Sequence, residues 1–240
     1  MVGKSQIKFI KSLQQKKYRN QHRMFAVEGI KSVKELLNSN IEAHKVYCVN
    51  PSLIENESGL VELISAGDFK KISTLKNPNG VLGVFIIPKP KVVDQNDWLL
   101  ALDDVRDPGN LGTIIRLCDW FGIKNLLCSE NTVDCFNPKV LQASMGSITR
   151  VNVVYTDLVT FLEQTKLPVY GTFMNAASVY NKALPKKGIL VMGNEGNGIS
   201  SDIENLVNSK ISIPQFGDKA TESLNVASAT SIFLSEIRRV

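Results

Sequence analysis

The hydrophobic positions of this chain alternate between helical and strand spacing in two successive stretches. In the first stretch, Ile7, Ile10 and Leu13 recur at the spacing of a helix face. A second helix is predicted where apolar positions recur from residue 30 to a stop near Asn38. Short apolar runs bounded by polar residues indicate strands. The other elements predicted here are strands at 25–28, 45–49, 69–72 and 81–87 and a helix at 60–64.

The second stretch alternates more cleanly. Its predicted strands are mostly apolar throughout, which is typical of a parallel sheet covered on both faces. Helices are predicted between most of these strands, and the last helix from about 223 to 239. Because alternating strands and helices form right-handed units, we predict a mostly parallel α/β sheet. The predicted strands are 98–105, 125–129, 151–155, 169–173, 188–192 and 210–213.

A proline- and lysine-rich segment, 87–91, separates the two stretches. Such a segment cannot continue a sheet and favours an extended linker. The predicted organisation is a small α/β domain at 1–91 and a larger α/β domain at 92–240. The balance of charged residues changes sign at the same place. Residues 1–91 hold 15 Lys/Arg against 7 Asp/Glu, and residues 92–240 hold 13 Lys/Arg against 16 Asp/Glu. The two halves are therefore expected to bind different partners.

The strongest local charge bias lies at the start of the chain. Its first 23 residues hold seven Lys/Arg and no Asp/Glu, interleaved with Phe9, Tyr18 and His22. A row of lysines is commonly a solvated helix face, but without compensating acids we favour a surface that binds nucleic-acid phosphates. The residues predicted to make these contacts are Lys16, Lys17, Arg19 and Arg23.

Composition excludes several classes of protein. No apolar run approaches the roughly 18 residues of a membrane helix, and no secretory signal is recognisable. The chain has two histidines, and its cysteines lack C-x-x-C spacing, so no metal site is expected. Free core thiols in a reducing cytoplasm are the preferred interpretation. The cysteines are Cys48, Cys118, Cys128 and Cys135.

Three segments carry the pattern of a ligand site. They are 104–116, 191–199 and 213–228, and in each a predicted strand end turns through Gly or Pro into a helix. Backbone N–H groups and polar side chains converge on ligands at such turns. Glycines at 193, 196 and 198 suit close approach of the backbone to a cofactor. A nicotinamide-dependent Rossmann enzyme is disfavoured because no Gly-x-Gly-x-x-Gly follows the first strand.

In this order and spacing, the three segments resemble the SpoU/TrmH family of RNA ribose 2′-O-methyltransferases, over roughly residues 96–240. Residues 19–31 more weakly resemble the opening of an RNA-binding domain that many such enzymes carry. The resemblance implies a SPOUT domain with a C-terminal trefoil knot, S-adenosylmethionine as cofactor and a homodimer with its active site near the interface. The loop 218–222 is about two residues longer than is usual in the family.

The resemblance also assigns residues. Asn110 and Arg116 match its first motif, Glu195 its second, and Ser223 with Asn225 its third. These five are the implied catalytic set, in which Arg116 holds the target phosphate and stabilises the developing alkoxide, because a guanidinium is hardly ever neutral. The group that removes the proton stays open. The implied cofactor-binding residues are Thr172, Met192, Gly193, Ile213 and Leu224.

Each assignment has a structural alternative. Arg116 could be a surface arginine and Glu195 a charge at a helix start or the partner of a structural arginine. Asn110 could cap its helix, and Ser223 could be a helix N-cap. A non-catalytic RNA-binding protein of the same fold is a second alternative, against which the retained motif residues argue. Ribosomal and transfer RNA both remain candidate substrates; the separate basic domain favours ribosomal RNA.

Overall fold

The computed structural model describes residues 2–54, 59–217 and 223–239. Contacts between Cα atoms divide the chain into two units. Unit 1 comprises 1–89 with 136–149, and unit 2 comprises 90–135 with 150–240. Unit 1 thus includes a segment from within the range predicted for the second domain. The functional domain boundary at residue 91 stays a prediction.

Unit 1 is built on a four-stranded sheet of order β1-β4-β2-β3. β4 pairs antiparallel with β1 and β2, whereas β2 and β3 are parallel. One face carries a core that joins α1 to α4 through Ile10, Leu13 and Ile72. The elements are α1 (Lys4–Ser12), α2 (Lys16–His22), β1 (Met24–Glu28), α3 (Ile30–Leu37), β2 (Ala43–Cys48), η1 (Pro51–Leu53), β3 (Val61–Leu63), α4 (Ala66–Ile72), β4 (Val81–Ile86), α6 (Pro138–Ser144) and η2 (Ser147–Thr149).

The predicted helices around Ile10 and at 30–38 and the predicted strands at 25–28, 45–49 and 81–87 are present. Two predictions in unit 1 are wrong: the segment predicted as a helix, 60–64, contains a strand, and the segment predicted as a strand, 69–72, belongs to a helix. Residues 61–63 form strand β3, because they pair in parallel with β2. Residues 66–72 form helix α4, whose start is set by the Ser65 side chain accepting from the Asp68 N–H at 3.0 Å. Both segments are too short for their own spacing to decide between helix and strand.

Unit 2 is a six-stranded sheet of order β10-β8-β9-β5-β6-β7, in which each recorded strand pair is parallel. The six strands predicted from the sequence are all present, so the expected α/β class is confirmed; the knot stays a prediction. The elements are β5 (Leu99–Leu102), α5 (Pro108–Trp120), β6 (Asn125–Cys128), β7 (Asn152–Tyr155), α7 (Leu158–Gln164), β8 (Val169–Ser178), η3 (Val179–Asn181), β9 (Ile189–Met192), α8 (Ser201–Glu204), β10 (Ser209–Ser212) and α9 (Val226–Ile237).

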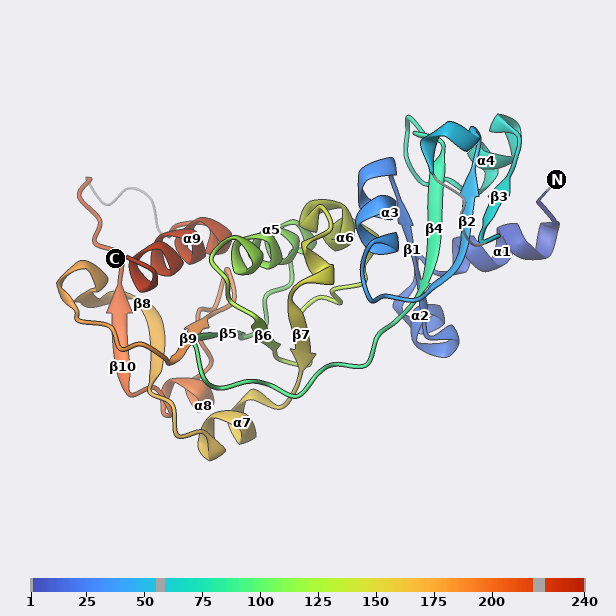
Figure 1. The fold of residues 1–240 in the computed structure, drawn as a ribbon. Coiled ribbons are helices and arrows are strands. Elements are labelled where there is room, and N and C mark those ends of the chain that lie inside the picture. The colour runs from blue at the N-terminus through green and yellow to red at the C-terminus, as the bar shows by residue number, and fades with distance from the viewer. Residues whose placement is uncertain (1, 55–58, 218–222, 240) are drawn as a thin grey trace. The chain divides into compact units, whose positions relative to one another are not determined.

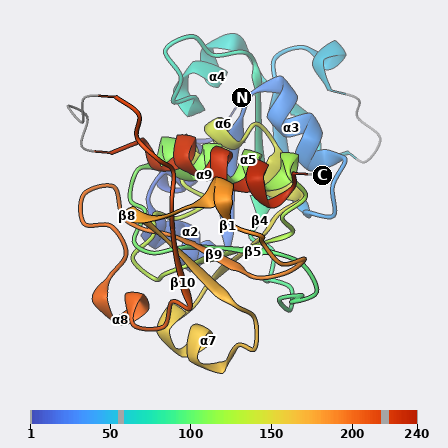
Figure 2. The ribbon, with the colours of Figure 1, turned by 90° about the vertical axis from the view of Figure 1, so that its left-hand side faces the viewer.

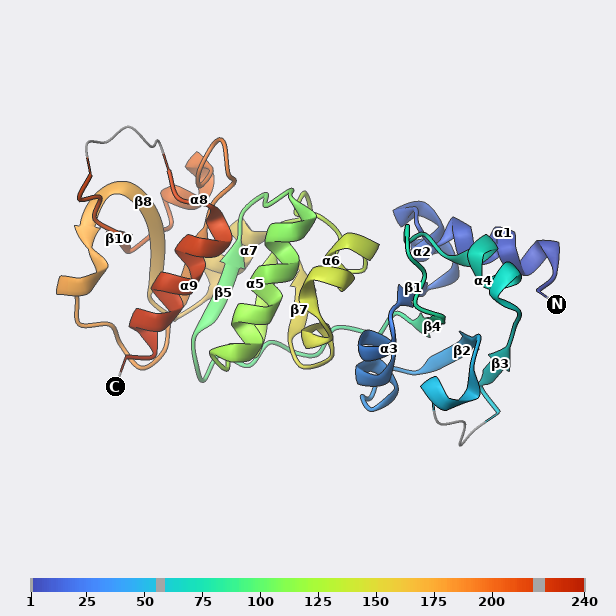
Figure 3. The ribbon, with the colours of Figure 1, turned by 90° about the horizontal axis from the view of Figure 1, so that it is seen from above.

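Helices cover both faces of the unit 2 sheet. α5 and α9 pack side by side on one face (Figures 1 and 3), and α7 and α8 lie on the other (Figure 2). The α7–α8 side is closed by a core in which Leu158 and Ile203 meet Ala101 and Val191 of the central strands. Because both faces are covered, β5, β6 and β9 are buried along their whole length.

Two helices of unit 2 begin away from the predicted residue. α5 begins at Pro108, two residues earlier than expected, and Asp107 is its cap, accepting from the Asn110 N–H at 2.7 Å. α9 begins at Val226 instead of near Ser223, because the Asn225 side chain caps it by accepting from two backbone N–H groups. The side chain of Asn110 is thereby left available for contacts outside its own helix.

Candidate active site

The expected site residues gather where strands of unit 2 end at their carboxyl side. Asn110 lies in the first turn of α5 after β5, Glu195 in the turn after β9, and Asn225 at the start of α9. In open parallel sheets this edge is where ligands bind. Three chain segments that are remote in sequence therefore meet at one place.

A hydrogen-bonded relay joins these three residues. The Asn225 side-chain amide donates to Asn110 Oδ1 at 2.9 Å, and the Asn110 amide donates to Glu195 Oε1 at 2.9 Å. The donor-to-acceptor direction of these two hydrogen bonds is fixed at both ends of the relay. Asn225 Oδ1 must accept from the helix N–H groups of Ala227 and Ser228, and the Glu195 carboxylate can only accept. The relay therefore orients the Glu195 carboxylate from the amino end of α9.

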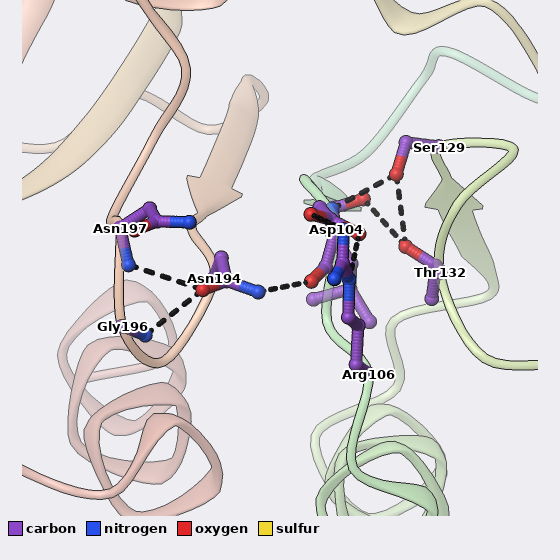
Figure 4. Close-up of polar contacts among 8 residues, drawn as sticks. Asp104, Arg106, Ser129, Thr132, Asn194, Gly196 and Asn197 are labelled. Carbon is purple, nitrogen blue, oxygen red and sulfur yellow. Dashed lines mark hydrogen bonds and ion pairs between the residues drawn. The ribbon is translucent and has the colours of Figure 1, made fainter.

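Asn194 builds the turn that carries Glu195. Its side-chain oxygen accepts from the N–H groups of Gly196 and Asn197 at 2.9 and 3.0 Å, and its amide donates to the Asp104 carbonyl at 2.7 Å (Figure 4). Backbone hydrogen bonds in both directions between Asn194 and Gly198 close the turn. One side chain therefore shapes the β9 turn and fastens it to the end of β5. The sequence motifs did not single out Asn194, although an Asn among glycines is a turn signal.

Asp104 is the residue on the β5 side of this junction. Its backbone is left-handed, with φ of 60°, a conformation that Asp tolerates better than most residues. Its N–H donates to Ser129 Oγ at 2.8 Å, and its carboxylate accepts two hydrogen bonds from the Arg106 guanidinium (Figure 4). The neighbouring residue makes a second polar contact: the buried Asp103 carboxylate accepts a hydrogen bond from the Ser200 N–H at 2.7 Å. The ends of β5, β6 and β9 are thus held together by polar contacts.

A pocket of about 720 Å³ opens beside the Glu195 turn. This volume lies within the roughly 300–1,000 Å³ of small-molecule sites. All five residues predicted to bind the cofactor line it, together with Glu195 and Ser223 of the predicted catalytic set. Gly196 and Gly198, which the sequence predicted to approach a cofactor, also line it, and the remaining lining residues are Phe173, Met174, Asn194, Asn197, Pro214, Gln215, Val226, Ala229 and Phe233.

An irregularity in β8 shapes one wall of this pocket. Lys210 of β10 pairs with Gly171, but its neighbour Ile211 pairs with Ala177. The residues between, 172–176, bulge away from the β10 ladder, and Thr172 is fixed there by donating its hydroxyl to the Val191 carbonyl at 3.0 Å. Bulges of this kind redirect side chains next to functional sites.

Gly193 lines the pocket, but its need for glycine has a different cause from the expected one. A Cβ atom at Gly193 would lie 2.2 Å from the carbonyl carbon of Gly198 and 2.3 Å from the nitrogen of Ile199. The space beside Gly193 is therefore filled by the chain's own turn. The expectation that glycine here keeps space free for a ligand is wrong, and a side chain would instead disturb the turn that carries Glu195.

Arg116 is not part of the relay within one chain. It is exposed on α5, lies six residues beyond Asn110, and does not line the pocket. Six residues correspond to about 9 Å along a helix and a large rotation about its axis. Trp120, one turn further on the same face, is 84% exposed. This face of α5 thus presents a cation and a large aromatic ring to solvent.

Three of the four residues predicted to bind phosphates are exposed in unit 1, namely Lys16, Lys17 and Arg23. Arg19 is an exception, with 1% exposure. Its guanidinium donates to the carbonyls of Leu13 and Gln14, both at 2.9 Å, and so fixes the turn between α1 and α2. The prediction that Arg19 contacts RNA is therefore corrected, because its donors point into the protein.

The four cysteines are buried and unbridged, and burial raises the pKa of the Cys128 thiol well above its ordinary value. Among the described residues, no cluster of His, Cys, Asp and Glu could hold a metal ion. Within the same residues, no helix has the length and apolarity needed to cross a membrane.

Two family models match the chain. The SpoU rRNA Methylase family model matches residues 97–235, and a model described as an MRM3-like substrate binding domain matches residues 4–83. The first match covers more than half of the chain and includes all five predicted catalytic residues.

Similar proteins match over almost the full length. The chain is 30% identical over 239 residues to the 23S rRNA (guanosine(2553)-2′-O)-methyltransferase RlmP of Bacillus subtilis, covering 97% of this chain and 95% of that one. A TrmH-family structure from Porphyromonas gingivalis is 37% identical, with a TM-score of 0.92, and covers 100% of this chain and 99% of that one. An AdoMet-bound rRNA methyltransferase structure from Sinorhizobium meliloti is 29% identical, with a TM-score of 0.87, covering 100% and 97%.

Proposed function

The chain belongs to the SpoU rRNA Methylase family, and on this premise we propose that it transfers a methyl group from S-adenosylmethionine to a ribose 2′-hydroxyl of ribosomal RNA. The observation that carries the proposal is the Asn225–Asn110–Glu195 relay beside a pocket of about 720 Å³. The names of the relatives, which include 2′-O-methyltransferases of 23S rRNA from Bacillus subtilis and Neisseria meningitidis, support the choice of substrate.

The pocket fits S-adenosylmethionine in size and in chemistry. Met192, Ile213 and Leu224 offer apolar surface for the adenine ring, and the backbone of the 193–198 turn offers polar groups. The cofactor, when bound, supplies an electrophilic methyl group attached to a sulfonium. Backbone contacts of this kind depend on the shape of the turn, which Asn194 fixes.

The side chains at the pocket mouth align the substrate. Glu195 keeps one oxygen on Asn110, which leaves its other oxygen available for a ribose hydroxyl. Ser223 also lines the pocket and can contribute a second polar contact. Holding the 2′-hydroxyl in line with the transferred methyl lowers the entropic part of the barrier. The Arg116 guanidinium binds the neighbouring phosphate and stabilises the alkoxide as it forms.

In the proposed homodimer, Arg116 of one chain completes the active site of its partner chain. Trp120 lies exposed on the same face of α5, and Trp is enriched at protein interfaces. A hollow of about 470 Å³ beside this helix, lined in part by Phe121, Tyr180 and Ile232, can receive a ring. In a dimer with a two-fold axis, the Trp120 ring of each chain can then enter the hollow of the other chain. Burying Trp120 would bring Arg116 to the partner's pocket. A cytoplasmic location and the trefoil knot remain expectations from the family.

The test is methyl transfer by the purified protein. With S-adenosylmethionine labelled in its methyl group and ribosomal RNA from a strain lacking the gene, label should appear on a ribose 2′-oxygen at one position. The same RNA from the parent strain should accept little, because the position is already methylated. Label on transfer RNA only would favour the tRNA alternative. Cofactor and RNA binding without transfer to either RNA would favour a non-catalytic protein.

A further inference from the structure

Both histidines of the chain contact the same phenylalanine in unit 1. The rings of Phe9 and His22 have centroids 5.1 Å apart and an interplanar angle of 85°, and those of Phe9 and His44 are 6.4 Å apart at 72°. Phe9 comes from α1, His22 ends α2, and His44 belongs to β2. Both imidazoles are exposed, while Phe9 is half-buried and packs against the core below. We call these three residues the aromatic cluster.

The local backbone is irregular at both histidines. In the β2–β4 ladder, Ala43 pairs with Phe85 and Lys45 with Val84, so His44 has no partner and lies at a bulge. His22 is followed by Arg23, whose φ of 55° is left-handed. Glycine is the ordinary residue at such a helix end, and a residue with a Cβ is less stable there. An exposed arginine at this position is therefore not explained by the stability of the turn.

Cations adjoin two members of the aromatic cluster in the sequence, whereas the exposed Glu42 lies two residues before His44. Lys8 precedes Phe9 and Arg23 follows His22, both exposed, in a stretch of 23 residues without an acid. Lys45 beside His44 is paired with Glu62 at 3.3 Å. Two histidines alone are too few for a metal site, and no group of three candidate ligands exists in the described part of the chain. Exposed aromatic rings bordered by cations are what RNA-binding surfaces use to stack unpaired bases.

We propose that the aromatic cluster is a stacking platform for an unpaired base of the RNA substrate, with Arg23 and Lys8 contacting the flanking phosphates. This inference rests on the proposed function in that the substrate is RNA. It adds that unit 1 recognises a single-stranded element, since bases in a duplex are not accessible to side chains in this way. A helix of ribosomal RNA would be bound at a loop, bulge or end.

The first experiment measures binding of the full chain to a short single-stranded RNA that contains 2-aminopurine, whose fluorescence is quenched by stacking. His22→Ala and His44→Ala should each weaken binding by about tenfold, the scale of losing one stacked base. The slope of log affinity against log salt should stay unchanged, because neither variant removes a phosphate contact. His22→Tyr should keep most of the affinity and the fluorescence change. Gln21→Ala, at an exposed neighbour on α2, is the matched control and should behave like the parent.

The second experiment separates function from folding at Arg23. Arg23→Gly should leave the thermal unfolding midpoint unchanged or raise it, because glycine suits the left-handed backbone. RNA affinity should nevertheless fall, and the salt slope should become flatter by about 0.7 for one lost contact on a single strand. A lower unfolding midpoint with unchanged RNA affinity would assign Arg23 a structural role only.

The outcomes distinguish this inference from the proposed function. Parental affinity and fluorescence in both histidine variants would overturn the platform, even if methyl transfer is found as proposed. Failure of the parent chain to prefer the single strand over a duplex of the same sequence would also overturn it. Loss of binding in the histidine variants by a protein that transfers no methyl group would keep the platform and reject the enzyme. Binding of an acidic peptide at the same site with equal affinity would show a general anion surface, which contradicts base stacking.

Discussion

Asn110 donates its side-chain amide to Glu195 at 2.9 Å across a separation of 85 residues in the sequence. This contact connects the first turn of α5 to the loop after β9, and Asn225 extends it to α9. The position of one carboxylate oxygen is therefore set by two other chain segments. Such a relay matters for alignment of a substrate more than for binding of the cofactor.

Replacement of Glu195 should separate the alignment of the substrate from the binding of the cofactor. In Glu195→Gln the side-chain oxygen still accepts from Asn110, so we expect a smaller loss of the methyl-transfer rate than in Glu195→Ala, where at least a tenfold loss is expected. The dissociation constant for S-adenosylmethionine should change little in both. Single-turnover rates and calorimetry provide the two measurements. Equal rates in the two variants would show that the hydrogen bond to Asn110 has no part in the reaction.

Arg116 should contribute to the reaction and not to cofactor binding. Arg116→Ala is expected to lower methyl transfer about a hundredfold or more, the scale of removing one key electrostatic donor. Arg116→Lys should recover only part of this loss, because an ammonium lacks the planar fork of a guanidinium. Near-normal turnover in Arg116→Ala would leave Arg116 as an ordinary surface arginine.

The sequence predicted the centre of unit 2 well because β5, β6 and β9 are buried along their whole length, which leaves a mostly apolar run for each. It failed at β3 and α4, where pairing with β2 and capping by Ser65 decide the conformation of short segments. The motif residues predicted the site, but spacing alone could not show what fills the space beside Gly193. Likewise, the charge of Arg19 gave no sign that its donors bind carbonyls of a neighbouring turn. The loop 218–222, predicted to be longer than usual, lies outside the described residues.

Filling the pocket should reduce cofactor affinity. Ala229 of α9 lines the pocket and is only partly exposed, so Ala229→Leu should weaken binding of S-adenosylmethionine by tenfold or more, because the added atoms occupy ligand space. Ser201→Leu, at an exposed position of α8, is the control and should bind normally. Circular dichroism must show that both variants are folded. Unchanged affinity in a folded Ala229→Leu protein would place the cofactor elsewhere.

Substitution of Gly193 should affect the stability of the protein, unlike substitution of Ala229. Since a Cβ at Gly193 meets the backbone of Gly198 and Ile199, Gly193→Ala should lower the thermal unfolding midpoint as well as cofactor affinity. Ala229→Leu should affect mainly the affinity. A Gly193→Ala protein with parental stability and weak cofactor binding would restore the interpretation that glycine here keeps ligand space open.

Asp97 and Arg238 should make stability depend on pH in the acid range. Arg238 donates two hydrogen bonds to the Asp97 carboxylate, and these, together with the Trp98 N–H, hold the pKa of Asp97 below its ordinary value despite partial burial. A lowered pKa stabilises the folded protein above the unfolded pKa, and this stabilisation is lost as pH falls through the folded pKa. Because the pair is partly exposed, we expect at most about 1 kcal/mol.

Urea unfolding at several pH values checks this. Asp97→Asn should be less stable than the parent near pH 7, and the difference should shrink below about pH 4, where the parent carboxyl becomes protonated. Asp202→Asn, at an exposed position of α8, should follow the parent throughout. A constant difference between Asp97→Asn and the parent down to the acid limit would mean that packing, and not charge, is responsible.

The last prediction concerns Trp120 and the partner chain. Trp120→Glu should convert the proposed homodimer into a monomer, because a charge cannot be buried in an apolar hollow without large cost. Leu63→Glu adds the same charge at another exposed apolar position and should leave the dimer intact. Light scattering coupled to size exclusion measures both masses. Methyl transfer should fall with the dimer, since Arg116 would lose its place in the partner's site.

Mixing two inactive variants tests whether Arg116 acts across the dimer. In a mixed dimer of Arg116→Ala and Glu195→Ala chains, the chain that keeps Glu195 receives Arg116 from its partner, so one of the two sites is complete. Activity should therefore reappear on mixing and increase as the subunits exchange. If Arg116 acts within its own chain, neither site is complete and the mixture stays inactive. That result, with a dimer still present, would mean that Arg116 reaches the pocket beside Glu195 by a movement of α5 within one chain.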